Sequence, residues 1–122
     1  MTILCVDNTP IMLQSLKETV VNAFPQANTQ AFLATESALN YAQENGCDVL
    51  LCEINPPRLD GLFLAEKIKM INPRVNIIFV TVCSENEHAK VVMKLKPSGY
   101  LTKEATSAQI MEELQNLRYP VA

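Results

Sequence analysis

Short apolar runs alternate along the chain with longer segments in which apolar residues recur at helical spacing. Three runs are continuously apolar and rich in β-branched or aromatic residues, namely Ile3–Val6, Val49–Cys52 and Ile77–Val80. Runs of this length and composition are typical of strands that are buried on both faces, as in a parallel sheet. Two weaker runs, Thr29–Leu33 and Gly99–Thr102, predict an outer strand and a short edge strand.

Helices are expected between and after these runs. The first is introduced by Thr9, a candidate N-cap, and by Pro10, which suits the first helical position. The fourth is introduced by Ser84 and Glu87, which have the spacing of a capping box. The apolar positions that define the faces of the first, second, third and fifth helices are Leu13, Leu16, Val20 and Ala23; Ala38, Leu39 and Ala42; Leu64, Ala65, Ile68 and Ile71; and Ile110, Leu114 and Leu117.

The alternation of strands with helices predicts a parallel sheet with helices on both faces. Right-handed crossovers leave few topologies. Five strand–helix units favour a flavodoxin-like, doubly wound α/β fold with strand order 2-1-3-4-5. We expect one domain over residues 1–118, because 122 residues suit a single domain and no repeat interrupts the pattern. Residues 119–122 are expected to begin a linker.

Composition narrows the functional classes. Hydrophobic residues make up 48% of the chain and charged residues 19%, which argues against intrinsic disorder. The formal net charge of −3 argues against sequence-independent nucleic-acid binding, which depends on lysine and arginine. No apolar run approaches the roughly 20 residues of a membrane-spanning helix, and Met1–Asp7 lacks the features of a signal peptide. We therefore expect a cytoplasmic protein. Cys5, Cys47, Cys52 and Cys83 form no Cys-x-x-Cys pair and are interpreted as reduced core residues.

Polar residues follow the predicted strands directly, at the edge of the sheet where α/β proteins bind their ligands. They are Asp7 and Asn8 after the first strand, Glu53 and Asn55 after the third, Thr81 after the fourth and Lys103 after the fifth. Two carboxylates on neighbouring strands repel one another unless a proton or a cation lies between them. Mg²⁺ would relieve this repulsion, and a lysine and a hydroxyl would suit the oxygens of a phosphoryl group. Strand ends are commonly polar, so the pattern alone leaves a purely structural interpretation open.

Four segments carry a resemblance to a known family: residues 3–8, 48–61, 76–81 and 98–103. In this order and at this spacing they resemble the receiver domain of bacterial response regulators, over nearly the whole chain. The resemblance implies a signalling protein rather than an enzyme. It implies a domain that accepts a phosphoryl group from a histidine kinase and then changes its affinity for partners. The face involved would be formed by the fourth helix, the fifth strand and the fifth helix.

The same resemblance implies roles for individual residues. Asp7 stands at the position of a Mg²⁺ ligand, and Asn55 at that of a residue whose backbone carbonyl completes the metal site. Thr81 stands at the hydroxyl that senses the phosphate, Tyr100 at the aromatic switch and Lys103 at the lysine that pairs with phosphate. An organic cofactor is not implied.

The phosphoacceptor position departs from the family pattern, because Glu53 stands where the family has aspartate. The glutamate carboxylate lies about 1.5 Å further out, one carbon–carbon bond. A displacement of about 1 Å in a reacting group can cost on the order of 100-fold in rate. Asn8 stands where the family usually has a second acid, so we expect Mg²⁺ to bind weakly, if at all, at Asp7, Asn8, Glu53 and Asn55.

These departures predict a degenerate receiver of two-component phosphorelay signalling that works without phosphorylation. Glu53 is expected to pair with Lys103 and to hold the domain in one state. The domain would act through protein–protein contacts, with its own output domain or as a homodimer, and would regulate an output such as transcription. It would contact neither nucleic acid nor membrane itself. The segment 112–121 resembles the last receiver helix and the start of the linker in regulators with a C-terminal DNA-binding domain.

Two other functions remain as alternatives. The first is a working Mg²⁺-dependent phosphoacceptor, with Glu53 or another residue modified. The second is a flavodoxin-like cofactor-binding protein. The loop Asp7–Pro10 disfavours the second, because it has no glycine and opens with an acid, where a phosphate-bearing cofactor needs free backbone donors.

Overall fold

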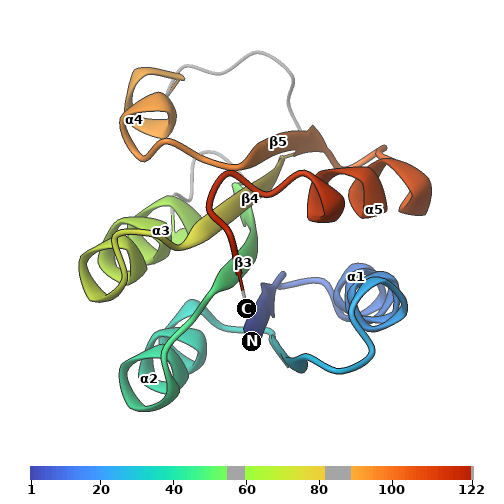
Figure 1. Cartoon of the computed structure of the whole chain (residues 1–122), viewed down its shortest axis with the longest axis horizontal. Helices are drawn as coiled ribbons and strands as arrows, with labels where there is room; N and C mark the ends of the chain where they lie inside the picture. Colours follow the sequence, from blue (N-terminus) through green and yellow to red (C-terminus); the bar gives the residue numbers. More distant parts are fainter. Residues whose placement is uncertain (55–59, 82–88, 122) are drawn as a thin grey trace.

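The computed structural model describes residues 1–54, 60–81 and 89–121, in which strands and helices alternate regularly (Figure 1). The elements are β1 (Thr2–Val6), α1 (Pro10–Ala23), β2 (Asn28–Phe32), α2 (Thr35–Asn45), β3 (Val49–Ile54), α3 (Asp60–Ile71), β4 (Asn76–Thr81), α4 (Ala89–Lys94), β5 (Gly99–Thr102) and α5 (Ser107–Gln115). Both weaker apolar runs form strands, as predicted.

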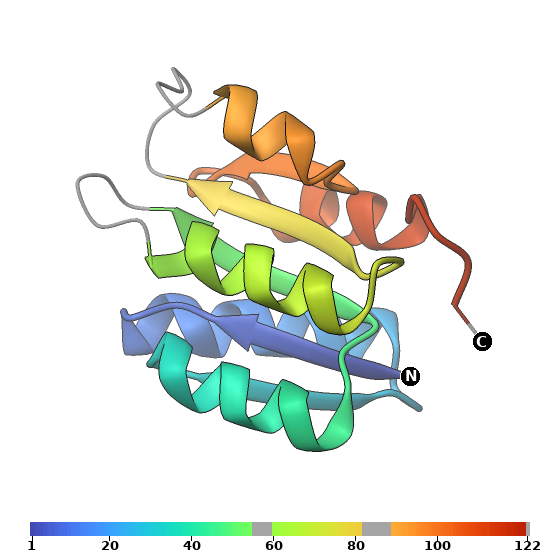
Figure 2. The ribbon, with the colours of Figure 1, turned by 90° about the vertical axis from the view of Figure 1, so that its left-hand side faces the viewer.

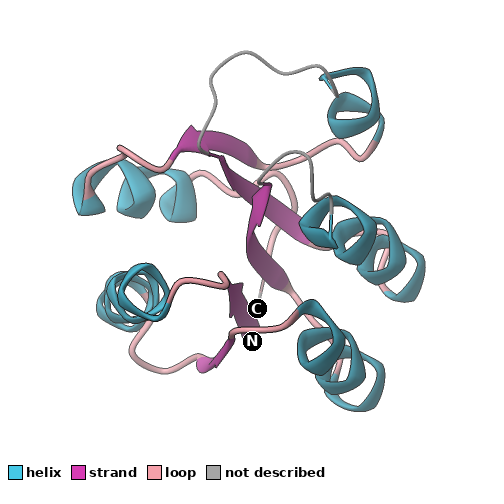
Figure 3. Ribbon diagram, turned by 180° about the vertical axis from the view of Figure 1, so that it is seen from behind, coloured by secondary structure: helices cyan, strands magenta, loops and turns pink. Residues whose placement is uncertain are grey.

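The strands form one parallel sheet in the order β2-β1-β3-β4-β5, which confirms the predicted flavodoxin-like topology. Helices α1 and α5 lie on one face of the sheet, and α2, α3 and α4 lie on the other (Figures 1 and 3). All strands run in the same direction, so their carboxyl ends meet at one edge and their amino ends at the opposite edge (Figure 2). In the described part of the chain, no helix combines the length and the apolar character needed to cross a membrane.

The core has two halves, one on each face of the sheet, and alternate strand residues supply them. Leu50 and Phe79 pack towards α2 and α3, whereas Leu51 and Ile78 pack towards α1 and α5. Residues on both faces are fully buried, which explains why these strands are apolar without interruption.

The described cysteines belong to this core. Cys5, Cys47 and Cys52 are buried and unpaired, as predicted. Burial raises the pKa of the Cys5 and Cys47 thiols to about 12, so both stay protonated at neutral pH. Cys83 lies outside the described residues.

The helix starts were predicted only in part. Thr9 is the N-cap of α1 and Pro10 follows it, but the Thr9 side chain makes no capping hydrogen bond. A capping box opens α5 instead, where the Thr106 hydroxyl accepts from the Gln109 backbone N–H and the Gln109 side chain accepts from the Thr106 N–H. The capping box predicted at Ser84 lies outside the described residues.

The C-terminal segment, residues 118–121, packs on the amino edge of the sheet and is hydrogen-bonded to it. The Asn76 side chain is buried there and uses both of its polar atoms on the backbone of Tyr119: Nδ2 donates to the Tyr119 carbonyl at 2.9 Å, and Oδ1 accepts from the Tyr119 N–H at 2.7 Å. The Arg118 N–H donates to the Ser98 hydroxyl at 2.6 Å, and Val121 packs against the core. Residues 118–121, at the expected start of the linker, therefore contact the domain.

Replacing Asn76 by alanine should destabilise the protein by roughly 1–3 kcal/mol, because the backbone N–H and carbonyl of Tyr119 lose their partner and a buried cavity forms. Denaturant unfolding monitored by circular dichroism measures this cost. Asn22→Ala, on the exposed side of α1, is the matched control and should stay within about 0.5 kcal/mol of wild type. An Asn76→Ala cost as small as that of the control would contradict the role given to this side chain.

Candidate functional site

The carboxyl ends of β1, β3 and β5 bring two acids and one lysine together. Lys103 Nζ lies 2.5 Å from Glu53 Oε2 and 3.4 Å from Asp7 Oδ2. Lys103 follows β5 directly, and its backbone N–H donates to the Thr81 carbonyl at the end of β4. The predicted ion pair between Glu53 and Lys103 is therefore present, and Asp7 shares the same ammonium.

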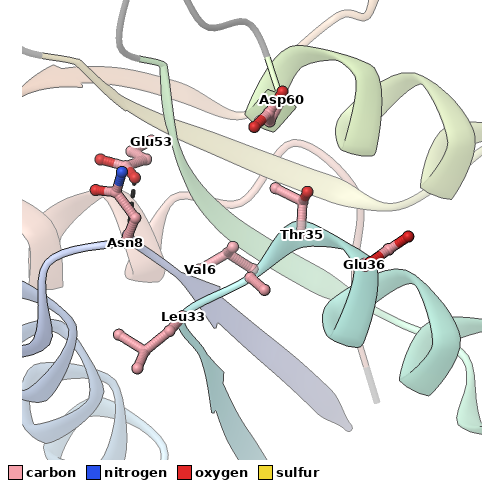
Figure 4. Close-up of a pocket in the computed structure, with 9 residues that line it drawn as sticks. Val6, Asn8, Leu33, Thr35, Glu36, Glu53 and Asp60 are labelled. Carbon is pink, nitrogen blue, oxygen red and sulfur yellow. Dashed lines mark hydrogen bonds between the residues drawn. The ribbon is translucent and has the colours of Figure 1, made fainter.

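Both carboxylate oxygens of Glu53 are engaged. Oε2 accepts from Lys103, and Oε1 accepts from the backbone N–H of Asn8 at 2.8 Å (Figure 4). The side chains of Glu53 and Lys103 are only 12% and 15% exposed, so water screens their attraction incompletely. Asn8 thus contacts Glu53 through its backbone N–H.

Asp7 is the most deeply buried of the three charged groups. Its Oδ1 accepts from the backbone N–H of Thr9 at 2.9 Å, which fixes the turn between β1 and α1. Burial raises the pKa of the Asp7 carboxyl, and the charge of Glu53 raises it further; the Thr9 hydrogen bond and Lys103 act in the opposite direction. The net effect favours the protonated form relative to an exposed aspartate.

Gly61 allows α3 to begin directly beside Glu53. A Cβ atom on Gly61 would lie 1.9 Å from the Glu53 backbone oxygen, so a side chain at this position would displace either the helix or the strand. The sequence pattern did not single out Gly61 for this position. The signal was a glycine at the start of a helix, where an ordinary helix former would be expected.

Thr81 and Tyr100 occupy neighbouring strands next to this cluster. Thr81 is buried, and its hydroxyl donates to the backbone carbonyl of Ile54 at 2.9 Å. Tyr100 lies opposite Phe79 in the β4–β5 register and is partly buried against the core. Asn55, the other predicted site residue, lies outside the described residues.

A cavity of about 510 Å³ adjoins the Glu53 carboxylate and separates the start of α2 from the start of α3 (Figure 4). Glu36 and Asp60 line it together with Asn8 and Glu53. Glu53 therefore lies in the wall of a cavity large enough for a small molecule.

The described residues fit a divalent metal poorly. All four carboxylate oxygens of Asp7 and Glu53 already meet a donor, from a backbone N–H or from Lys103. Within residues 1–54, 60–81 and 89–121, no group of three or more histidine, cysteine, aspartate or glutamate residues is placed to hold a metal ion. The Lys103 ammonium already provides the positive charge that these two acids require.

Comparison with known proteins identifies the family of this chain. A family profile described as the response regulator receiver domain matches residues 3–115. The response regulator UvrY of Escherichia coli is 30% identical over 82 residues, which are 67% of this chain and 38% of UvrY. The response regulator GacA of Pseudomonas aeruginosa is 28% identical over 82 residues, again 67% of this chain and 38% of GacA. The match thus spans less than half the length of these relatives.

Solved structures show the same fold. A CheY-like receiver domain from Methanospirillum hungatei has a TM-score of 0.81 at 21% identity and covers 93% of this chain and 90% of its own. The receiver domain of DrrB, activated with BeF3, has a TM-score of 0.79 at 21% identity and covers 93% of both chains. RcsB of Salmonella enterica, bound to a promoter, has a TM-score of 0.77 at 21% identity and covers 97% of this chain and 68% of its own. The chain therefore belongs to the response regulator receiver domain family.

Proposed function

We propose that this receiver domain signals without phosphorylation, because Glu53 holds the site in a fixed state. The observation that carries the proposal is the 2.5 Å contact between Glu53 Oε2 and Lys103 Nζ. The family resemblance assigns to Lys103 the role of pairing with phosphate. In this chain Glu53 already provides Lys103 with an anionic partner. The glutamate carboxylate reaches Lys103 with no phosphoryl group between them.

Glu53 is poorly disposed to accept a phosphoryl group. A carboxylate oxygen that attacks a phosphorus atom must turn a lone pair towards it, and the contacts of Oε1 with the Asn8 N–H and of Oε2 with Lys103 oppose such a reorientation of Glu53. Freeing Oε2 would leave the Lys103 ammonium beside Asp7 alone, in a region where charges are only partly exposed. This cost adds to the displacement of about 1.5 Å that separates a glutamate carboxylate from an aspartate one.

Mg²⁺ is proposed to be dispensable for this domain. Receiver domains generally bind Mg²⁺ at the phosphorylation site. The metal would neutralise the acids there and orient a phosphoryl donor. In this chain Lys103 lies within ion-pair distance of both described acids, so a metal would have to displace its ammonium. The position of the second usual acid is taken by Asn8, which adds no negative charge.

The output is proposed to be regulatory and to pass through protein contacts. Relatives of this chain are response regulators in which the matched segment is only part of a longer protein. We propose that α4, β5 and α5 contact an output domain or a second copy of the chain. Met93 and Val91 of α4 are 68% and 37% exposed, an apolar surface that suits such a contact. We propose transcription as the regulated output and the cytoplasm as the location. A histidine kinase would be an optional partner. The domain itself would contact neither a membrane nor nucleic acid.

One observation favours a second candidate, a working phosphoacceptor. The cavity beside Glu53 would admit a small phosphoryl donor. In that case the donor would break the Glu53–Lys103 pair on entry, and Mg²⁺ would have to compensate for the loss.

Acetyl phosphate and Mg²⁺ should leave the wild-type protein unmodified, as read by intact mass. Glu53→Asp should gain a phosphoryl group, because its shorter carboxylate retracts from Lys103 by about one bond and opens the position that a phosphoryl group would fill. Glu53→Gln is the control and should stay unmodified. A labile phosphoryl group on the wild-type protein would overturn the proposal and establish the second candidate.

The Asp7 carboxyl should titrate above its ordinary value of 3.8. Because its pKa is higher in the folded than in the unfolded state, the folded state holds the proton to higher pH. The stability contributed by Asp7 is therefore largest below about pH 3.8 and declines as the pH rises through the folded pKa. Carbon-detected NMR of the Asp7 side chain measures the midpoint.

Asp7→Asn provides the matching stability test. Its free energy of unfolding, relative to wild type, should improve as the pH is raised through the same window, because the asparagine does not ionise. An Asp7 midpoint at or below 3.8 would show that the lysine and the Thr9 hydrogen bond outweigh burial.

A further inference from the structure

Three cationic side chains surround the ring of Tyr119 at the amino edge of the sheet. The distance to the ring centroid is 5.0 Å for Lys69 Nζ, 5.4 Å for Arg74 Cζ and 5.9 Å for Arg118 Cζ. Lys69 belongs to the last turn of α3, Arg74 to the loop between α3 and β4, and Arg118 to the C-terminal segment. Three separate parts of the chain therefore place positive charge around one aromatic side chain.

The backbone that carries the cluster is held in place by hydrogen bonds. Asn76, which is fully buried, binds the backbone N–H and carbonyl of Tyr119, and Ser98 binds the backbone N–H of Arg118. Arg74 is fixed by its own backbone N–H, which donates to the Asn72 side chain at 3.0 Å. The backbone positions of the two arginines thus follow from the fold.

Within the described part of the chain, none of these three cations forms an ion pair with an acid. The ion pairs found there are those of Lys103 with Asp7 and Glu53, at the opposite edge of the sheet. The Lys69 ammonium is buried against the Tyr119 side chain and interacts with its ring and its hydroxyl, which carry no full negative charge. Cations gathered without an anion repel one another. This local excess of positive charge stands out in a chain whose net charge is −3.

We propose that Lys69, Arg74 and Arg118 bind the phosphate group of a small anionic molecule beside Tyr119. Guanidinium groups bind phosphate oxygens through paired N–H donors, and both arginines are exposed, so an anion can approach them from solvent. A phosphate bound by the two arginines would supply the negative charge that the cluster lacks, and the buried Lys69 ammonium beside them would add to the attraction. A long polyanion fits less well, because the rest of this acidic chain would repel it.

This site is independent of the Glu53–Lys103 pair and lies at the other end of the strands (Figure 2). Its consequence concerns the C-terminal segment. An anion that binds Arg74 and Arg118 together joins that segment to the α3–β4 loop, and a ligand that binds only the docked form stabilises it by mass action.

Titration of the 122-residue protein with inorganic phosphate and with pyrophosphate, at constant ionic strength, tests the proposal. Backbone amide NMR should show saturable shifts at Lys69, Arg74, Arg118 and Tyr119. Arg74→Gln combined with Arg118→Gln should weaken pyrophosphate binding about tenfold or more, because two charge-assisted contacts are lost. Lys17→Gln combined with Lys90→Gln removes the same charge from exposed positions in α1 and α4, and should leave the affinity unchanged.

Two further variants keep the test specific. Arg74→Lys combined with Arg118→Lys retains the charge but not the paired donors, and should bind with intermediate affinity. Glu53→Asp should bind like wild type, which separates this site from the proposed function. Circular dichroism shows whether each variant is folded.

Three results would overturn the proposal. The first is a linear, non-saturable response to both anions. The second is equal weakening in the Arg74/Arg118 and Lys17/Lys90 variants, which would reduce the effect to overall charge. The third is tighter binding of a short DNA duplex than of pyrophosphate, with a steep dependence on salt, which would make the ligand a nucleic acid.

Discussion

An ammonium group between two carboxylates is the constraint on which the site depends. Lys103 lies within reach of both Asp7 and Glu53, and all three side chains are at most 15% exposed. Charges so poorly solvated cannot stay unpaired without a large free-energy cost. Removal of one partner leaves the other as an uncompensated, partly buried charge. These three side chains therefore tie the ends of β1, β3 and β5 to one another.

The fold supplies the geometry that this ion pair needs. A parallel sheet places the carboxyl ends of non-consecutive strands at one edge, so residues 7, 53 and 103 meet although they are far apart in the sequence. Backbone groups complete the arrangement, since the N–H groups of Asn8 and Thr9 each bind one of the acids. In most members of the family, as the resemblance implies, a metal ion and a phosphoryl group act at this edge. Here the protein's own donors satisfy both acids.

Sequence patterns predicted the part of this site in which side-chain position follows from strand order alone. The apolar runs predicted the sheet, and parallel strand ends then predicted that Asp7, Glu53 and Lys103 converge. Features that depend on tertiary packing were not predictable. The close approach of Gly61 to Glu53 requires the path of α3, and the binding of Tyr119 by Asn76 joins residues 43 positions apart. The hydrogen bond from the Asn8 backbone N–H to Glu53 was likewise not predictable from the sequence pattern.

The most direct test of the central claim is a double-mutant cycle between Glu53 and Lys103, measured as free energies of unfolding in the absence of Mg²⁺ and of any phosphoryl donor. Glu53→Gln keeps an acceptor for the Asn8 N–H, and Lys103→Met keeps much of the aliphatic stem. A fixed ion pair of this exposure predicts a coupling of about 1–3 kcal/mol. A coupling within about 0.3 kcal/mol of zero would show that the two side chains do not pair in the unphosphorylated protein, and would contradict a state held by Glu53.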